Sequence, residues 1–173
     1  MRGVFCSLDR LCLACLFFLI LLLFLFFRKV MKPLFDHEKL EVYQRSIDFA
    51  KWCVPVLDCI PASTSIRSQL DRASVSIPLN IAEGNGKWSR KDRCRFFDIS
   101  RGSALECAAA LDIASARGLL DPQQVTEGKC ILIAVVRMLI GLIQANDPER
   151  GLERGEFKVG ENLEEYRTEK EKE

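Results

Sequence analysis

Apolar positions recur at intervals of three and four residues along four stretches of the chain, which is the spacing of one buried helix face. Four helices are therefore expected, from about Asp36 to Cys59, from Ser65 to Gly84, from Arg90 to Arg117 and from Pro122 to Ala145. Stretches that alternate apolar and polar residues are short, so no β-strand is expected. Because the connections are short, neighbouring helices should run antiparallel. The pattern predicts an all-α protein, an up-down-up-down antiparallel four-helix bundle over residues 31–146.

Residues that favour helix ends support these boundaries. Ser89, with Asp92 three residues later, resembles a capping box at the start of the third helix. Asp121 followed by Pro122 combines an N-cap with a first-turn proline at the start of the fourth helix. Gly118 ends the third helix.

The apolar stripes predict which face of each helix is buried. The first, second and fourth helices carry one main stripe each: Leu40, Tyr43, Ile47, Ala50, Val54 and Leu57; Ile66, Leu70, Ala73, Ile77, Asn80 and Gly84; and Val125, Leu132, Val135, Val136, Leu139, Leu142 and Ile143. The third helix carries two: Phe96, Ile99, Ser103, Ala110 and Ile113, and beside it Phe97, Ser100, Ala104, Cys107, Leu111 and Ala114. A helix with two apolar faces needs two partners, because monomers avoid large exposed apolar patches. We therefore expect a closed homo-oligomer in which one head-to-tail contact repeats around a ring.

Residues 1–30 form an apolar leader, with an unbroken apolar run from Leu11 to Phe27. A cleaved signal peptide is disfavoured, because Arg28 and Lys29 follow directly where small residues are needed. A membrane anchor is physically possible, since the run is only slightly shorter than a hydrocarbon core. We favour a mis-assigned start, with Met31 as the first residue made, because a run of Leu, Phe, Cys and Ile is typical of translated thymine-rich DNA. We therefore expect a cytoplasmic protein, with membrane contact only if the leader is made.

The chain as a whole is nearly neutral, but its charges are unevenly distributed along the sequence. The net charge of +1 excludes a strongly basic protein that coats nucleic acid by overall attraction. Residues 147–173 hold ten acidic and six basic residues with few apolar ones, which predicts a disordered tail or a frayed, solvated helix.

The residue types available limit the chemistry. A single histidine, His37, excludes most sites built on histidine pairs or triads. Eight cysteines are present, but only Cys12 and Cys15 are spaced as Cys-x-x-Cys, and no histidine lies at zinc-ligand spacing. We expect reduced cysteines, no metal, no cofactor and no enzymatic activity, since no nucleophile and base are paired.

A basic stretch opens the third helix and is the candidate binding surface. It contains six bases, Lys87, Arg90, Lys91, Arg93, Arg95 and Arg101, against two acids, Asp92 and Asp98. Such a surface can bind the phosphates of RNA or DNA in a salt-sensitive way, helped by the dipole of the helix N-terminus. Trp88 is the one aromatic residue in it able to stack on a base. The alternatives are a solvated helix face, or ion pairs of Arg95 and Arg101 with Asp98 or with a neighbouring subunit.

Two motifs give the chain a family resemblance. Residues 69–86 read QLDRASVSIPLNIAEGNG, and residues 89–106 read SRKDRCRFFDISRGSALE. The matching residues are Gln69, Leu70, Arg72, Ala73, Ser76, Ile77, Asn80, Ile81, Ala82, Glu83 and Gly84, then Arg95, Phe96, Ile99, Gly102, Ser103 and Glu106. Over about Phe35 to Asn146 the chain resembles the four-helix-bundle family named for the 23S rRNA intervening-sequence protein.

The resemblance implies a small, non-enzymatic bacterial protein of the cytoplasm that assembles as a homopentamer. It also relates the chain to the accessory protein of diversity-generating retroelements, which binds nucleic acid and a reverse transcriptase. An RNA or DNA partner and a protein partner are therefore both expectations. The alternative is a structural or protein-interaction bundle with no nucleic-acid role.

The polar residues of the two motifs, Asn80, Glu83, Ser103 and Glu106, fall on or beside the apolar stripes. Paired carboxylates can serve catalysis or metal binding, but a di-iron bundle needs histidines that these helices lack. We expect instead a structural polar layer in which Asn80 and Ser103 bond the two carboxylates and fix the register of the helices.

Overall fold

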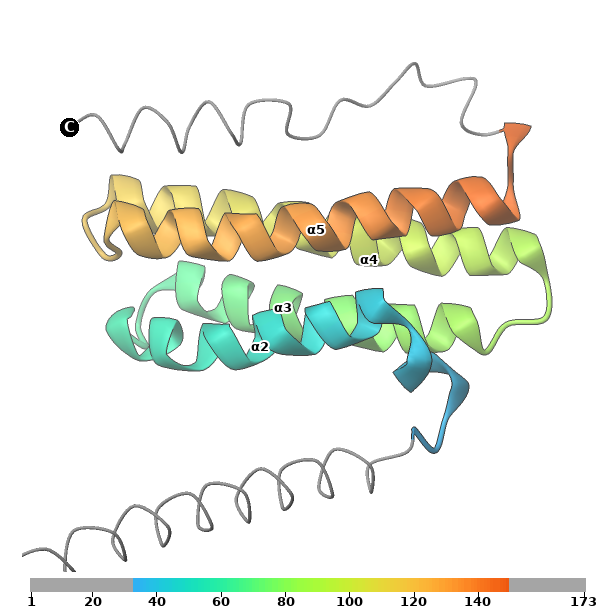
Figure 1. The fold of residues 1–173 in the computed structure, drawn as a ribbon. Coiled ribbons are helices and arrows are strands. Elements are labelled where there is room, and N and C mark those ends of the chain that lie inside the picture. The colour runs from blue at the N-terminus through green and yellow to red at the C-terminus, as the bar shows by residue number, and fades with distance from the viewer. Residues whose placement is uncertain (1–32, 150–173) are drawn as a thin grey trace, which may run out of the picture. The chain divides into compact units, whose positions relative to one another are not determined.

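The computed structural model describes residues 33–149, a range that holds one short 3₁₀ helix, four α-helices and no strand. The elements are η1 (Asp36–Lys39), α2 (Glu41–Cys59), α3 (Ser65–Asn85), α4 (Arg90–Ala116) and α5 (Pro122–Asn146). Figure 1 shows the four α-helices lying side by side, with α2 and α3 in one layer and α4 and α5 in the other. The prediction of an all-α protein with four helices is confirmed, and each predicted boundary other than the first lies within one residue of the observed one.

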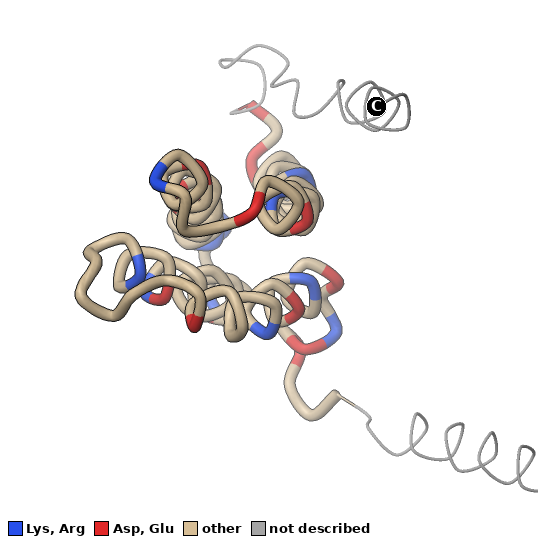
Figure 2. Tube along the Cα trace, turned by 90° about the vertical axis from the view of Figure 1, so that its left-hand side faces the viewer, with Lys and Arg blue, Asp and Glu red and all other residues tan. Residues whose placement is uncertain are grey.

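Successive helices run antiparallel. The end of one helix contacts the start of the next, as in Asp58 with Arg67 and Asp112 with Lys129. Along α3, the contacts with α4 move toward the start of α4, from Arg72 with Glu106 to Ser76 with Ser103. The same two layers appear in the end-on view of Figure 2. These contacts agree with the up-down-up-down order that the short connections predict.

The first α-helix differs from the prediction in its start and in its buried face. Leu40 is extended, with ψ of 123°, so it separates η1 from α2. The buried residues of α2 are Val42, Ser46, Phe49, Cys53 and Val56, whereas Val54 is 61% exposed. The stripe predicted through Val54 is therefore wrong. Ser46 obscures the true stripe in the sequence, but its hydroxyl donates to the Tyr43 carbonyl at 2.6 Å, which offsets the cost of burying it.

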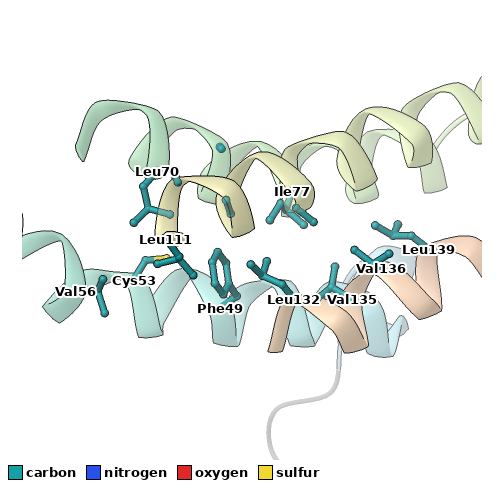
Figure 3. Close-up of a cluster of buried hydrophobic side chains, with 14 of the residues drawn as sticks. Phe49, Cys53, Val56, Leu70, Ile77, Leu111, Leu132, Val135, Val136 and Leu139 are labelled. Atoms are coloured by element: carbon teal, nitrogen blue, oxygen red, sulfur yellow. The ribbon is translucent and has the colours of Figure 1, made fainter. Parts of the chain in front are cut away.

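The core fills the space between the two layers. Figure 3 shows Phe49 of α2, Leu70 and Ile77 of α3, Leu111 of α4 and Leu132 of α5 converging on it. Apart from Leu142, which is half-buried, the stripe predicted for the last helix is buried, as is most of that predicted for α3.

On α4 the two predicted stripes behave differently. Every residue of the stripe that begins at Phe97 is buried. In the stripe that begins at Phe96, Ser103 and Ala110 are buried, but Ile99 and Ile113 are each 42% exposed. The described bundle thus uses one apolar face of α4 fully and leaves part of the second in contact with water.

The helix ends are held as their residue types predict. The Ser89 hydroxyl accepts from the Asp92 amide at 3.4 Å, and the Asp121 carboxylate accepts from the Gln123 amide at 2.7 Å. Gly118 has φ of +67°, the left-handed conformation that ends α4. Among the described helices, α5 alone is long and apolar enough to cross a membrane, and here it packs on α4 and α2 as a bundle helix. The predicted leader (residues 1–30) and the tail beyond residue 149 lie outside the described residues.

Candidate nucleic-acid interface

The loop Gly86–Ser89 joins α3 to α4, and the basic stretch begins in it. We call this loop, together with the first two turns of α4, the α3–α4 corner. Gly84, just before the loop, lets the two helices approach closely: a Cβ atom there would lie 2.9 Å from Cε1 of the buried Phe97 ring. The amides of Gly86 and Lys87 donate back to the carbonyls of Ala82 and Gly84, at 3.2 and 3.1 Å. The loop is therefore fixed to the end of α3.

Two of the six candidate bases hold the corner together. Lys87 Nζ lies 3.0 Å from Glu83 Oε1 and 4.6 Å from the centre of the Phe96 ring. Arg93 Nε donates to the Lys87 carbonyl at 2.7 Å and so ties the first turn of α4 to the loop. The guanidinium of Arg93 is thus partly engaged inside the protein.

A third base, Arg101, does not belong to the exposed surface. Its side chain is 18% exposed, and its Nη2 lies 3.4 Å from Asp98 Oδ1. The alternative interpretation of an Arg101–Asp98 ion pair is confirmed. Being mostly buried, Arg101 contributes less to an interface than its place in the sequence suggests.

The other three bases face solvent. Arg90, Lys91 and Arg95 are exposed, and within residues 33–149 no hydrogen bond or ion pair engages their side chains. Lys91 and Arg95 lie four residues apart, on one face of α4 and about 6 Å apart along its axis. The predicted patch of six bases therefore reduces to three that are available to a polyanion.

Trp88 lies at the tip of the corner. Its side chain is 100% exposed, the highest value among the exposed large apolar residues in the described range. Figure 2 views the bundle from the opposite end and shows Lys and Arg interspersed with Asp and Glu on the helices. What distinguishes the corner is a fully exposed indole beside three bases that have no partner in the described part of the chain.

The four polar motif residues lie on α3 and α4, but they do not form the predicted layer. The prediction that Asn80 and Ser103 bond the carboxylates is wrong. Ser103 and Asn80 bond the Ser76 hydroxyl instead, at 2.8 and 3.0 Å. Asn80 also donates to the Ser76 carbonyl at 2.8 Å, and Ser103 to the Ile99 carbonyl at 3.1 Å.

The two carboxylates face outward and pair with bases. Glu83 pairs with Lys87, and Glu106 Oε1 lies 3.2 Å from Arg72 Nη2. Both carboxylates are exposed, with side-chain exposures of 53% and 44%. Ser76 belongs to the motif but was not predicted as part of the polar layer, because the register of α3 against α4 decides which groups meet. The arrangement is a short hydroxyl–amide chain flanked by surface ion pairs.

Large apolar side chains are exposed on both α3 and α4. Val75 and Leu79 of α3 are 48% and 63% exposed, and Ile99 and Ile113 of α4 are each 42% exposed. We call these four residues the α3–α4 apolar face. The α4 members were predicted as part of a second stripe; the α3 members were not, although Val75 and Leu79 are four residues apart.

We looked among the described residues for side chains that could bind a metal or act as nucleophiles. No cluster of three or more metal-ligating side chains occurs among them. Cys53 and Cys107 are buried, and burial raises the pKa of the Cys53 thiol to about 12 and moves that of Cys107 in the same direction. Thiols held protonated are poor nucleophiles and poor metal ligands.

Similarity to known proteins gives the family. No curated protein is significantly similar to the chain. A crystal structure of a protein of unknown function from the S23 ribosomal protein family of Bacteroides thetaiotaomicron has the same fold, with a TM-score of 0.56 and 22% identity over 60% of this chain and 98% of that one. Residues 38–141 match the profile of the 23S rRNA-intervening sequence proteins. The matched residues include all of α3, all of α4 and the α3–α4 corner. The chain belongs to the 23S rRNA-intervening sequence protein family.

Proposed function

We propose that the protein is a non-enzymatic, cytoplasmic, oligomeric bundle that binds RNA or DNA at the α3–α4 corner. The observation that carries the proposal is the set of three exposed bases, Arg90, Lys91 and Arg95, which have no partner within residues 33–149 and lie beside the fully exposed Trp88 ring. Bases in this state can replace phosphate counterions without first breaking an ion pair. Binding of this kind is independent of sequence and weakens as salt increases.

Assembly would compensate for the small size of the interface. Three phosphate contacts per subunit are few, and the chain as a whole is nearly neutral. A ring of subunits would present several corners at once, so that many weak contacts act as one strong one. The α3–α4 apolar face supports assembly, because Leu79 and Ile99 lose contact with water if a second copy covers them. The number five rests on family resemblance alone.

A charge-reversal variant tests the nucleic-acid role. The variant Arg90→Glu, Lys91→Glu, Arg95→Glu should abolish binding of a single-stranded oligonucleotide at low salt. For a strand that contacts one subunit, the wild-type affinity should fall about 20-fold between 50 and 200 mM salt, because three phosphate contacts give a log–log slope of about −2 for a single strand. A strand that contacts several subunits of a ring should show a steeper slope.

The matched control makes the same change in net charge elsewhere. Arg45, Lys51 and Arg117 are exposed bases on α2 and at the end of α4. Their reversal to Glu should leave most of the affinity intact. Equal loss in both variants would indicate non-specific attraction. No loss in the corner variant would favour the alternative function, a structural or protein-interaction bundle.

A further inference from the structure

We propose that the Trp88 indole is a stacking platform for an unpaired base, so that the α3–α4 corner selects single-stranded over double-stranded nucleic acid. The inference rests on the proposed function and adds the class of ligand. It starts from the 100% exposure of the Trp88 side chain. A base in a duplex has both faces covered by its neighbours, whereas a base in a single strand can lay one face on an indole.

The backbone around Trp88 is held in place on both sides. On one side, the Lys87 carbonyl accepts from Arg93 Nε at 2.7 Å and the Lys87 amide donates to Gly84. On the other, Ser89 caps α4 through its hydroxyl. The ring is therefore presented from a fixed point of the chain, and little backbone freedom is lost when a ligand stacks on it.

The surrounding charges favour a nucleic acid over a membrane or a protein. Residues 87–95 contain five bases and one acid, Asp92. Trp88 is the only large apolar residue of the loop at residues 86–89, and Phe96 in the second turn of α4 is half-buried with Lys87 Nζ over its ring. The corner therefore lacks the several exposed apolar side chains that hold an amphipathic segment in a membrane interface. A single aromatic ring beside exposed bases matches the repeating unit of a single strand, which is one base and one phosphate.

The test compares wild-type and Trp88→Ala full-length chains, purified in mild detergent. Fluorescence anisotropy gives Kd for an oligothymidylate of about 16 nucleotides and for a DNA duplex of the same length. Trp88→Ala should weaken single-strand binding about 5- to 150-fold, the usual effect of removing one stacked base. Duplex binding should change less than about twofold, because the phosphate contacts remain.

Three further measurements separate stacking from other effects. Trp88→Tyr keeps an aromatic ring and should restore most of the single-strand affinity. Trp88→Ala should not unfold the bundle, since the side chain is fully exposed, and the circular dichroism spectrum checks this. The slope of log Kd against log salt should stay the same, because no charge is removed.

The outcomes are distinct for the two proposals. If the charge-reversal variant loses binding while Trp88→Ala keeps its single-strand affinity, stacking is refuted and the nucleic-acid role survives. If the wild type binds neither oligonucleotide, both fail. Trp88 fluorescence is obtained as the difference between the wild type and Trp88→Ala, because Trp52 also emits. If anionic lipid vesicles shift this emission to shorter wavelengths and the oligothymidylate does not quench it, the corner is a membrane contact and the inference is overturned.

Discussion

Gly84→Ala tests the close packing that brings α3 and α4 together at the corner. An added Cβ atom would lie 2.9 Å from Cε1 of Phe97 and 3.0 Å from Cβ of Phe96. The Phe97 ring is 2% exposed, so it cannot turn out into solvent to make room. The Phe96 contact is with Cβ, which moves only with the backbone of α4. The added methyl group must therefore push the two helices apart.

The expected magnitude is the balance of two effects. Overpacking a tight core costs about 1–3 kcal/mol. Replacing glycine by alanine in a helix returns about 0.5–1 kcal/mol, because the unfolded chain loses conformational freedom. The net loss in the free energy of unfolding should be about 1 kcal/mol, and at most about 2.5 kcal/mol.

Urea unfolding followed by circular dichroism measures this free energy. The matched control is Gly141→Ala, on the exposed side of α5, where an added Cβ meets nothing within 4 Å. The control should gain about 0.5–1 kcal/mol, so the two variants should shift the urea midpoint in opposite directions. A Gly84→Ala protein that is as stable as the wild type would refute the claim that Gly84 sets the distance between α3 and α4.

Two other predictions concern assembly and pH. The double variant Leu79→Glu, Ile99→Glu should reduce the oligomer to monomers in analytical ultracentrifugation, because a contact through the α3–α4 apolar face would bury the new charges. Helicity should be unchanged, since both side chains are exposed in the subunit, and the control Val54→Glu on α2 should leave the oligomer intact. An unchanged mass of the double variant would contradict a contact through this face. The free energy of unfolding should fall as pH rises above about 9. Burial raises the folded-state pKa of Cys53 to about 12 and also raises that of Cys107. Above about pH 9 the folded protein therefore retains protons that the unfolded chain releases. Replacing both cysteines by alanine should remove this alkaline slope in urea titrations, and an unchanged slope would show that other groups cause it.

The helices were predictable because several local signals agree. The Ser89 cap, the Asp121–Pro122 start and the Gly118 stop each depend on neighbours in the sequence, so the boundaries of the last two helices were predicted within one residue. The start of α2 was missed because Leu40 continues the apolar pattern while its backbone is extended.

Features that depend on contacts between helices were less predictable. The buried face of α2 was misassigned because Ser46 looks polar in the sequence, and only its bond to the Tyr43 carbonyl makes burial tolerable. The partners of Asn80 and Ser103 were wrong for a similar reason, since the register of α3 against α4 brings both to Ser76. The sequence shows which groups are polar, but not which of them meet.

In the candidate interface, too, the residue types were predictable from the sequence and their contacts were not. The sequence shows six bases between residues 87 and 101, but it does not show that Arg101 is mostly buried or that Arg93 donates to the Lys87 carbonyl. The exposure of Trp88 also could not be predicted from the sequence, because an isolated tryptophan is as consistent with core packing as with a surface role.

The most direct test of the account is the mass and composition of the protein in complex with nucleic acid. Light scattering combined with absorbance at two wavelengths, on the purified chain mixed with an oligothymidylate, gives both the number of subunits and the bound nucleotide. We expect a closed homo-oligomer that carries the oligonucleotide at low salt and releases it at about 1 M salt. A monomer without bound oligonucleotide would contradict it.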